Sequence, residues 1–114
     1  MQDIHRIYHN DIGIAFQWKK DLQKGNSNII QIVFRRTGFY LTVKEIKEFY
    51  RKIMVAKSHR CTGCHSNYKC DNVLLQTPSG KIDLAVTRAE LTEIEDLVKG
   101  TLFQIELDGY IKNL

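Results

Sequence analysis

The chain has 114 residues, of which 26% are charged and 43% are hydrophobic, with seven glycines and one proline. This length is typical of one domain, and the composition excludes a disordered tail, a collagen-like fibre and a low-complexity linker. The N-terminal residues lack the apolar core of a secretory signal, and no stretch approaches the roughly 18 apolar residues of a membrane span. We therefore expect a single cytoplasmic domain over residues 1–114.

The net charge of +4 is unevenly distributed along the chain. Residues 1–60 contain twelve Lys and Arg against five Asp and Glu, whereas residues 61–114 contain five against eight. Cations that share one face attract phosphate groups or an acidic partner. The candidate residues for binding nucleic acid or an acidic partner are Lys19, Lys20, Arg35 and Arg36. Aromatic residues interleaved with them suit either base stacking or the core of a small sheet: Tyr8, Phe16, Trp18, Phe34, Phe39 and Tyr40.

The first forty residues predict two pairs of strands. Residues 12–18 alternate, which places four apolar side chains on one face of a strand: Ile12, Ile14, Phe16 and Trp18. Residues 4–8 would pair with this strand through a turn at residues 10–11. Residues 20–28 are polar and predict a loop. The β-branched run at residues 28–34 predicts another strand, which turns at Gly38 into a short strand at residues 39–41.

Two capped helices are the clearest local signals. Thr42 and Glu45 fit a capping box at the start of an amphipathic helix that ends near residue 57. Thr87 and Glu90 fit a second box, which begins a long C-terminal helix with a buried stripe extending to Ile105. Between the helices, residues 73–77 and 81–86 predict a hairpin that turns at residues 78–80.

The two capping boxes suggest that a strand–strand–helix unit occurs twice, over residues 12–57 and 72–112, joined by residues 58–71. One apolar face on each strand and one apolar stripe on each helix predict an α+β fold, with a small, mostly antiparallel sheet packed against two amphipathic helices. We expect the helices to bury Ile46, Phe49, Ile53, Leu91, Ile94 and Val98 against the strand residues Ile14, Phe16, Ile32, Phe34, Leu75 and Leu84.

This order of elements resembles that of a known family. The resemblance covers residues 12–105 and rests on the run at residues 30–34, Gly38, Leu41-Thr42, Glu45, Phe49, Thr77-Pro78-Ser79, Leu84 and Glu90-Leu91. The pattern is similar to a family of short uncharacterised bacterial proteins with two strand–strand–helix units. The resemblance implies the α+β fold and no assigned activity. Members often carry a cysteine pair near the N-terminal strand, and residues 19–28 of this chain contain none, so no metal role is carried over.

The unusual chemistry of the sequence is concentrated in residues 59–70. Cys61 and Cys64 form a C-x2-C pair that allows two thiolates to approach one ion, and Cys70 supplies a third sulfur. His59 or His65 would complete a tetrahedral site with nitrogen and sulfur ligands. Zn²⁺ favours that ligand set and geometry.

Four interpretations of this segment stay open. They are a zinc site, an iron–sulfur cluster held by the three cysteines and one other ligand, a redox pair at Cys61 and Cys64 that Cys70 resolves, and thiols without a ligand. No glycine-rich phosphate loop, nucleophile elbow or H-E-x-x-H motif occurs in the sequence. The sequence therefore favours a small non-enzymatic interaction module with a protein partner and a zinc cofactor. The alternatives are a thiol redox protein or sensor, and a weak nucleic-acid binder that uses the basic first half.

The zinc interpretation predicts about one metal ion per chain in freshly purified protein, because a structural site contributes its binding free energy to folding. Elemental analysis measures the metal, and a chelator should lower the melting temperature. A metal-free chain whose melting is indifferent to chelator would contradict this expectation. The redox interpretation instead predicts a thiol with a lowered pKa and a reversible disulfide between Cys61 and Cys64.

Overall fold

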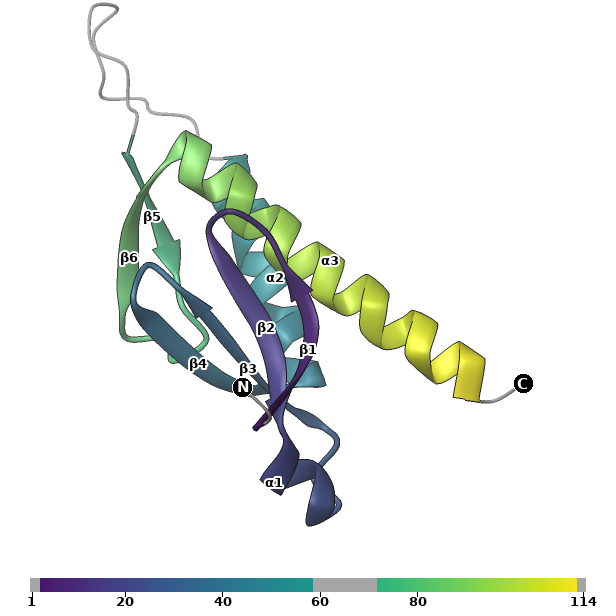
Figure 1. Ribbon diagram of the computed structural model, residues 1–114. Coiled ribbons are helices and arrows are strands. Elements are labelled where there is room, and N and C mark those ends of the chain that lie inside the picture. Colours follow the sequence, from purple (N-terminus) through teal and green to yellow (C-terminus); the bar gives the residue numbers. More distant parts are fainter. Residues whose placement is uncertain (1–2, 59–71, 113–114) are drawn as a thin grey trace, which may run out of the picture.

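The computed structural model describes residues 3–58 and 72–112 (Figure 1). The elements in chain order are β1 (Ile4–His9), β2 (Gly13–Trp18), α1 (Lys19–Gln23), β3 (Ile29–Phe34), β4 (Thr37–Thr42), α2 (Val43–Lys57), β5 (Asn72–Gln76), β6 (Asp83–Thr87) and α3 (Arg88–Lys112). Strands β1 to β4 form an antiparallel sheet in sequence order, and β5 pairs with β6 in a separate hairpin. The α+β prediction is confirmed, with two antiparallel sheets where we expected one. Within the described residues, no helix is long and apolar enough to cross a membrane.

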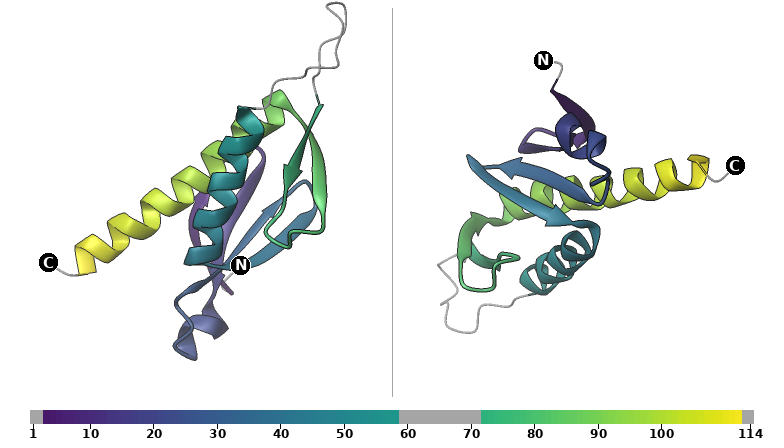
Figure 2. Two further views of the ribbon diagram at one scale, coloured as in Figure 1. Left: turned by 180° about the vertical axis from the view of Figure 1, so that it is seen from behind. Right: turned by 90° about the horizontal axis from the view of Figure 1, so that it is seen from below.

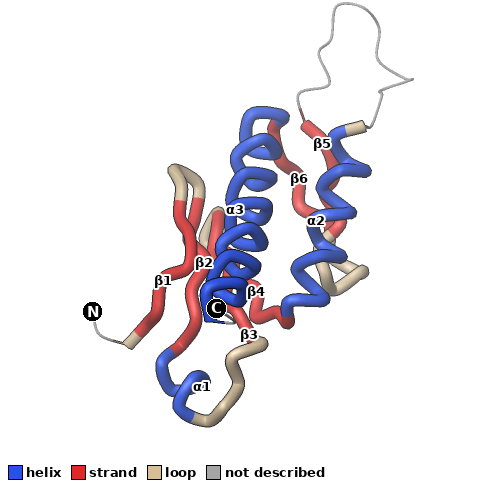
Figure 3. The backbone as a smooth tube through the Cα atoms, turned by 90° about the vertical axis from the view of Figure 1, so that its right-hand side faces the viewer, coloured by secondary structure: helices blue, strands red, loops and turns tan. Residues whose placement is uncertain are grey.

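The helices cover one face of the four-stranded sheet. Figure 2 and Figure 3 show α2 and α3 side by side on that face, with α3 against β1 and β2. Helix α2 also packs against β4 and β5, and α3 also contacts β6. The two sheets and the two long helices share one hydrophobic core. Its largest fully buried side chains are Phe34, Phe49, Ile30, Ile32, Ile46, Ile53, Leu75, Leu91, Ile94, Leu97, Val86 and Val98.

Both predicted capping boxes are present. The Thr42 hydroxyl accepts from the Glu45 backbone N–H at 3.2 Å, and the Glu45 carboxylate accepts from the Thr42 N–H at 2.9 Å. Thr87 and Glu90 repeat the arrangement at 3.0 and 2.8 Å. Each box satisfies backbone donors that a helix start leaves without partners. As a result, each of the β3–β4 and β5–β6 hairpins leads directly into a long helix.

The prediction that Ile14 and Phe16 of β2 face the core is wrong. Ala15 is fully buried in the core, and Gly13 lies so close to α3 that an added Cβ would be 3.0 Å from Leu97 Cδ2. Side chains alternate along a strand, so Ile14 and Phe16 point to the opposite face. Phe16 is nevertheless buried, with only 8% of its surface exposed, because neighbouring side chains such as Trp18 cover it on that opposite face.

Two local predictions are also wrong. Residues 19–23 form the short helix α1, where we expected a loop. The β3–β4 turn lies at Arg35 and Arg36, with φ of 51° and 61°, and Gly38 is part of β4. Positive φ at both central residues is the geometry of a two-residue hairpin turn that matches strand twist. Glycine or asparagine normally occupies such positions, so two arginines gave no local signal.

Gly13→Ala should lower the free energy of unfolding by about 2 kcal/mol, in the range of overpacked cores. The new Cβ would overlap the Val33 carbonyl oxygen and lie 2.8 Å from Phe34 Cβ, so backbone must move. Gly38→Ala in the same sheet is the control, because its Cβ would contact only the flexible Gln31 amide and the Val33 side chain. We expect a change within about 0.5 kcal/mol there. Equal urea midpoints for both variants would contradict the close contact.

Candidate functional site

The predicted metal ligands lie outside the described residues. His59, Cys61, Cys64, His65 and Cys70 all fall between α2 and β5, in residues 59–71. The metal prediction therefore stays a prediction. Among residues 3–58 and 72–112, no group of three or more His, Cys, Asp or Glu side chains could hold a metal ion.

The four predicted basic residues form two separate pairs. Lys19 and Lys20 begin α1 directly after β2, whereas Arg35 and Arg36 form the turn directly after β3. Since β2 and β3 run antiparallel, the last residues of the two strands lie at opposite ends of the sheet. The structure does not bring the two pairs together into one basic site.

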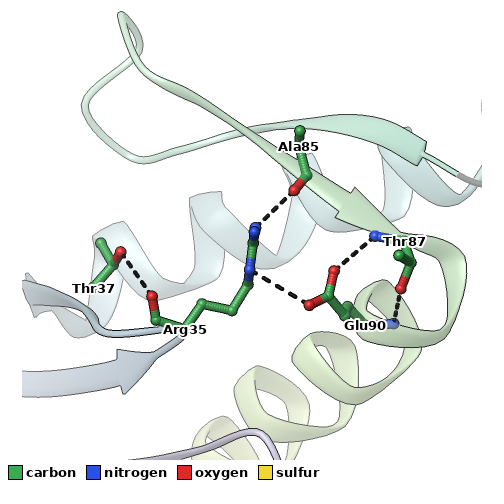
Figure 4. A network of polar contacts seen from close by, with 5 residues as sticks. All are labelled: Arg35, Thr37, Ala85, Thr87 and Glu90. Atoms are coloured by element: carbon green, nitrogen blue, oxygen red, sulfur yellow. Dashed lines mark hydrogen bonds and ion pairs between the residues drawn. The ribbon is translucent and has the colours of Figure 1, made fainter.

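Arg35 links the four-stranded sheet to the β5–β6 hairpin and α3 (Figure 4). Its Nη1 donates to the Ala85 carbonyl oxygen at 2.7 Å, and its Nε lies 3.5 Å from Glu90 Oε2. Glu90 uses its other carboxylate oxygen for the capping box with Thr87. These contacts give Arg35 a structural role. Arg36, the other residue of the turn, takes no part in them.

The other face of the four-stranded sheet is covered by neither α2 nor α3, and we call it the open face (Figure 3). Of the described helices, the short α1 contacts it, through Lys20 and Asp21. Strand pairing places twelve residues on the open face: Ile4, Arg6, His9, Ile14, Phe16, Trp18, Ile29, Gln31, Val33, Gly38, Tyr40 and Thr42. Its central row crosses all four strands in register, because Arg6 pairs with Phe16, Phe16 with Gln31, and Gln31 with Tyr40. The open face therefore combines aromatic, amide and basic side chains.

Ring packing and one hydrogen bond fix the aromatic side chains of the open face. The Phe16 and Trp18 rings meet edge to face, with centroids 5.1 Å apart at 82°. The Trp18 Nε1–H donates to Gln31 Oε1 at 3.2 Å. Lys20 Nζ lies 5.8 Å from the centroid of the Trp18 ring, within cation–π range. Sequence reasoning singled out Phe16, Trp18 and Lys20 but missed Arg6 and Gln31, which only strand register connects to them.

Tyr40 lies at the edge of the open face and is anchored by an acid. Its hydroxyl donates to Asp21 Oδ2 at 2.5 Å, and Asp21 in α1 is only 7% exposed. The hydrogen bond to the carboxylate, with desolvation and the nearby negative charge, raises the pKa of Tyr40 above its ordinary value. The short helix that we did not predict thus supplies the group that orients Tyr40.

A second exposed surface lies on the C-terminal half of α3, which projects beyond the sheet (Figure 1). Four large apolar side chains are exposed there, and we call them the α3 stripe: Phe103 (65%), Leu107 (39%), Tyr110 (66%) and Ile111 (56%). In the first half of the same helix, the exposed positions carry mostly polar or charged residues. The sequence-based prediction considered only the buried face of this helix. The four-residue spacing of Phe103, Leu107 and Ile111 was the signal that predicts a second apolar face.

A groove of about 600 Å³ runs between this half of α3 and the sheet. Its apolar lining comes from Ile7, Leu22, Ile30, Ile105 and Ile111, and His5 and Asp108 also border it. Ile111 belongs to both the groove and the α3 stripe. The two features therefore form one continuous apolar surface.

Tyr40 should ionise above the ordinary tyrosine pKa of about 10, and Asp21→Asn should return its pKa toward that value. A raised pKa in the folded state stabilises the protein below about pH 10. That stabilisation is lost as the pH rises through the raised value. Residue-specific NMR titration of the tyrosine ζ-carbons measures the change. Asp96→Asn is the control, because Asp96 raises the pKa of Tyr8 instead. An unchanged Tyr40 titration in Asp21→Asn would exclude the proposed cause.

No protein-family model, curated protein or solved structure matches this chain. The function proposed below therefore rests on the chain's own surfaces.

Proposed function

We propose that this protein is a small non-enzymatic interaction module. Its docking surface is the α3 stripe with the adjoining groove, and a second copy of the chain is the partner that this surface accepts. The observation that carries the proposal is the exposure of Phe103, Leu107, Tyr110 and Ile111 on a projecting helix. Contiguous exposed apolar side chains mark interaction sites, because burying them contributes roughly 25 cal/mol per Å².

The geometry of the stripe supports a second copy as the partner. An apolar stripe complements an identical stripe across a two-fold axis, the commonest symmetry of oligomers. The end of α3 extends away from the sheet, which leaves its stripe accessible to the α3 helix of a second copy (Figure 2). Four side chains alone bury less than the roughly 1,200–2,000 Å² of a stable interface. The groove beside Ile111 supplies further apolar area for the partner helix.

The groove beside the α3 stripe is lined mainly by apolar surface, which suits docking. The shifted pKa values within residues 3–58 and 72–112 belong to Tyr8, Tyr40 and the exposed pair Glu48–Arg51. Each shift has a hydrogen bond as its largest cause, and none of these residues lines the groove.

Zinc stays part of this proposal as a stabilising cofactor. Its ligands would be Cys61, Cys64 and Cys70 with His59 or His65, all outside the described residues. Metal content tests this part independently of the docking surface, because a chain can self-associate without metal and can bind metal as a monomer.

Sedimentation equilibrium of the full chain under reducing conditions tests the docking surface. We expect a concentration-dependent dimer, and we expect Phe103→Glu or Tyr110→Glu to weaken it at least about tenfold, as loss of a central aromatic contact does. Thr92→Glu places the same charge at an exposed position in the first half of α3 and should leave the dimer intact. The reducing agent prevents dimers linked by disulfides.

Two outcomes would contradict the proposal. One is a wild-type chain that is monomeric at about 1 mM, where even a free energy of association near −4 kcal/mol is visible. The other is a dimer that Phe103→Glu and Thr92→Glu weaken equally, which would place the interface elsewhere on the chain. Circular dichroism of each variant confirms that the helices remain folded.

A further inference from the structure

We infer that the open face is a binding site for single-stranded nucleic acid, with bases stacked on Trp18 and Tyr40 and phosphates held by Arg6 and Lys20. This site is independent of the α3 stripe, because the two surfaces share no residue and lie on different elements. Single strands are recognised by aromatic side chains that stack on bases and by cations that follow the backbone. The open face provides both.

Contacts within the chain orient the aromatic rings of the open face. Phe16 packs edge to face against Trp18 and holds the indole ring in place. Tyr40 is 51% exposed, and its bond to Asp21 fixes the phenol ring. Trp18 on β2 and Tyr40 on β4 are two strands apart, which separates them laterally by about 10 Å. Two separate rings can each stack on a different base of an extended strand, and preorganised rings lose little entropy on binding.

The charge of the open face is complementary to phosphate. Arg6 pairs in register with Phe16, and Lys20 lies over Trp18. Strands β1 to β4 contain no Asp or Glu. Two acids lie nearby: Asp21 is nearly buried and accepts a hydrogen bond from Tyr40, and the exposed Asp3 borders the same pocket as Trp18 and Lys20. Within the described chain, neither Arg6 nor Lys20 forms an ion pair, so both cations are available to a ligand.

Gln31 adds a hydrogen-bonding group between the two rings. Its Oε1 accepts from Trp18, which turns the amide so that Nε2 lies above Gly38. A Cβ at Gly38 would be 3.0 Å from that nitrogen, so the absence of a side chain there leaves space for the amide. The Nε2 hydrogens can therefore donate to acceptors on a base edge.

The same observations argue against other occupants of this face. Its aliphatic residues Ile4, Ile14, Ile29 and Val33 are half-buried, so the face lacks the exposed apolar centre of a protein interface. Tyr110 and its neighbours on α3 provide such a centre instead. Duplex bases are already stacked on one another and cannot use aromatic platforms. An unpaired strand is the ligand that uses every group on the open face.

Fluorescence anisotropy with a labelled oligothymidine of about ten nucleotides, a length within known site sizes, tests the inference on the full chain. We expect binding that weakens with salt and exceeds binding to a duplex of equal length. Trp18→Ala should weaken binding about 5- to 150-fold, which corresponds to loss of one stacked base. Arg6→Gln and Lys20→Gln, which leave the core intact, should each reduce the salt slope by about 0.7. Lys99→Gln on α3 is the matched control for charge, and Leu74→Ala on β5 is the control for loss of a large exposed apolar side chain.

Several results would overturn the inference. Absent or salt-independent binding would exclude the site. Equal losses for Lys20→Gln and Lys99→Gln would show attraction by net charge alone. Equal affinity for duplex and single strand would exclude base stacking, and unchanged binding by Trp18→Ala and Arg6→Gln would place the site elsewhere in the chain.

Discussion

The close contact between α3 and β2 is the constraint on which the rest of the structure depends. Gly13 leaves room for Leu97, and Ala15 is the next small residue on the same side of the strand. Larger side chains would hold the helix away from the sheet. Because neighbours along a strand point to opposite faces, fixing these two residues inward directs Phe16 and Trp18 outward. The aromatic character of the open face is therefore a consequence of how the core is packed.

A second set of contacts decides where α3 leaves the sheet. The Tyr8 ring lies against Gly100, and the Tyr8 hydroxyl donates to Asp96 Oδ2 at 2.9 Å. Asn10 Nδ2 donates to the same carboxylate oxygen at 3.0 Å and to the Glu93 carbonyl oxygen at 2.8 Å. These contacts all involve the first half of the helix. The second half continues past the sheet and exposes its apolar side chains, so the same helix both completes the core and presents a docking surface.

The sequence predicted those elements whose stability depends on residues close together in the chain. Both capping boxes were identified because their hydrogen bonds join residues three apart, and β3 was identified from its β-branched run. The prediction for the inward face of β2 was wrong. Alternation defines two faces of a strand, and only the contact of β2 with α3 determines which face is buried. The turn at Arg35 and Arg36 carries no glycine and was missed. The open face was only partly predicted, since Arg6 and Gln31 join Phe16 through pairing across strands. The metal prediction concerns residues 59–70, outside the described chain.

Nuclear Overhauser contacts of Trp18 and Gly13 test the orientation of β2 most directly. The single tryptophan of the chain makes its indole signals unambiguous. The structure predicts contacts from the Gly13 α-protons to the Leu97 methyl groups, and from the Trp18 ring to the side chains of Gln31 and Lys20. Contacts from the Trp18 indole to the methyl groups of Leu97 or Val98 would instead place the aromatic residues in the core. That result would contradict the account of the open face and the binding site inferred on it.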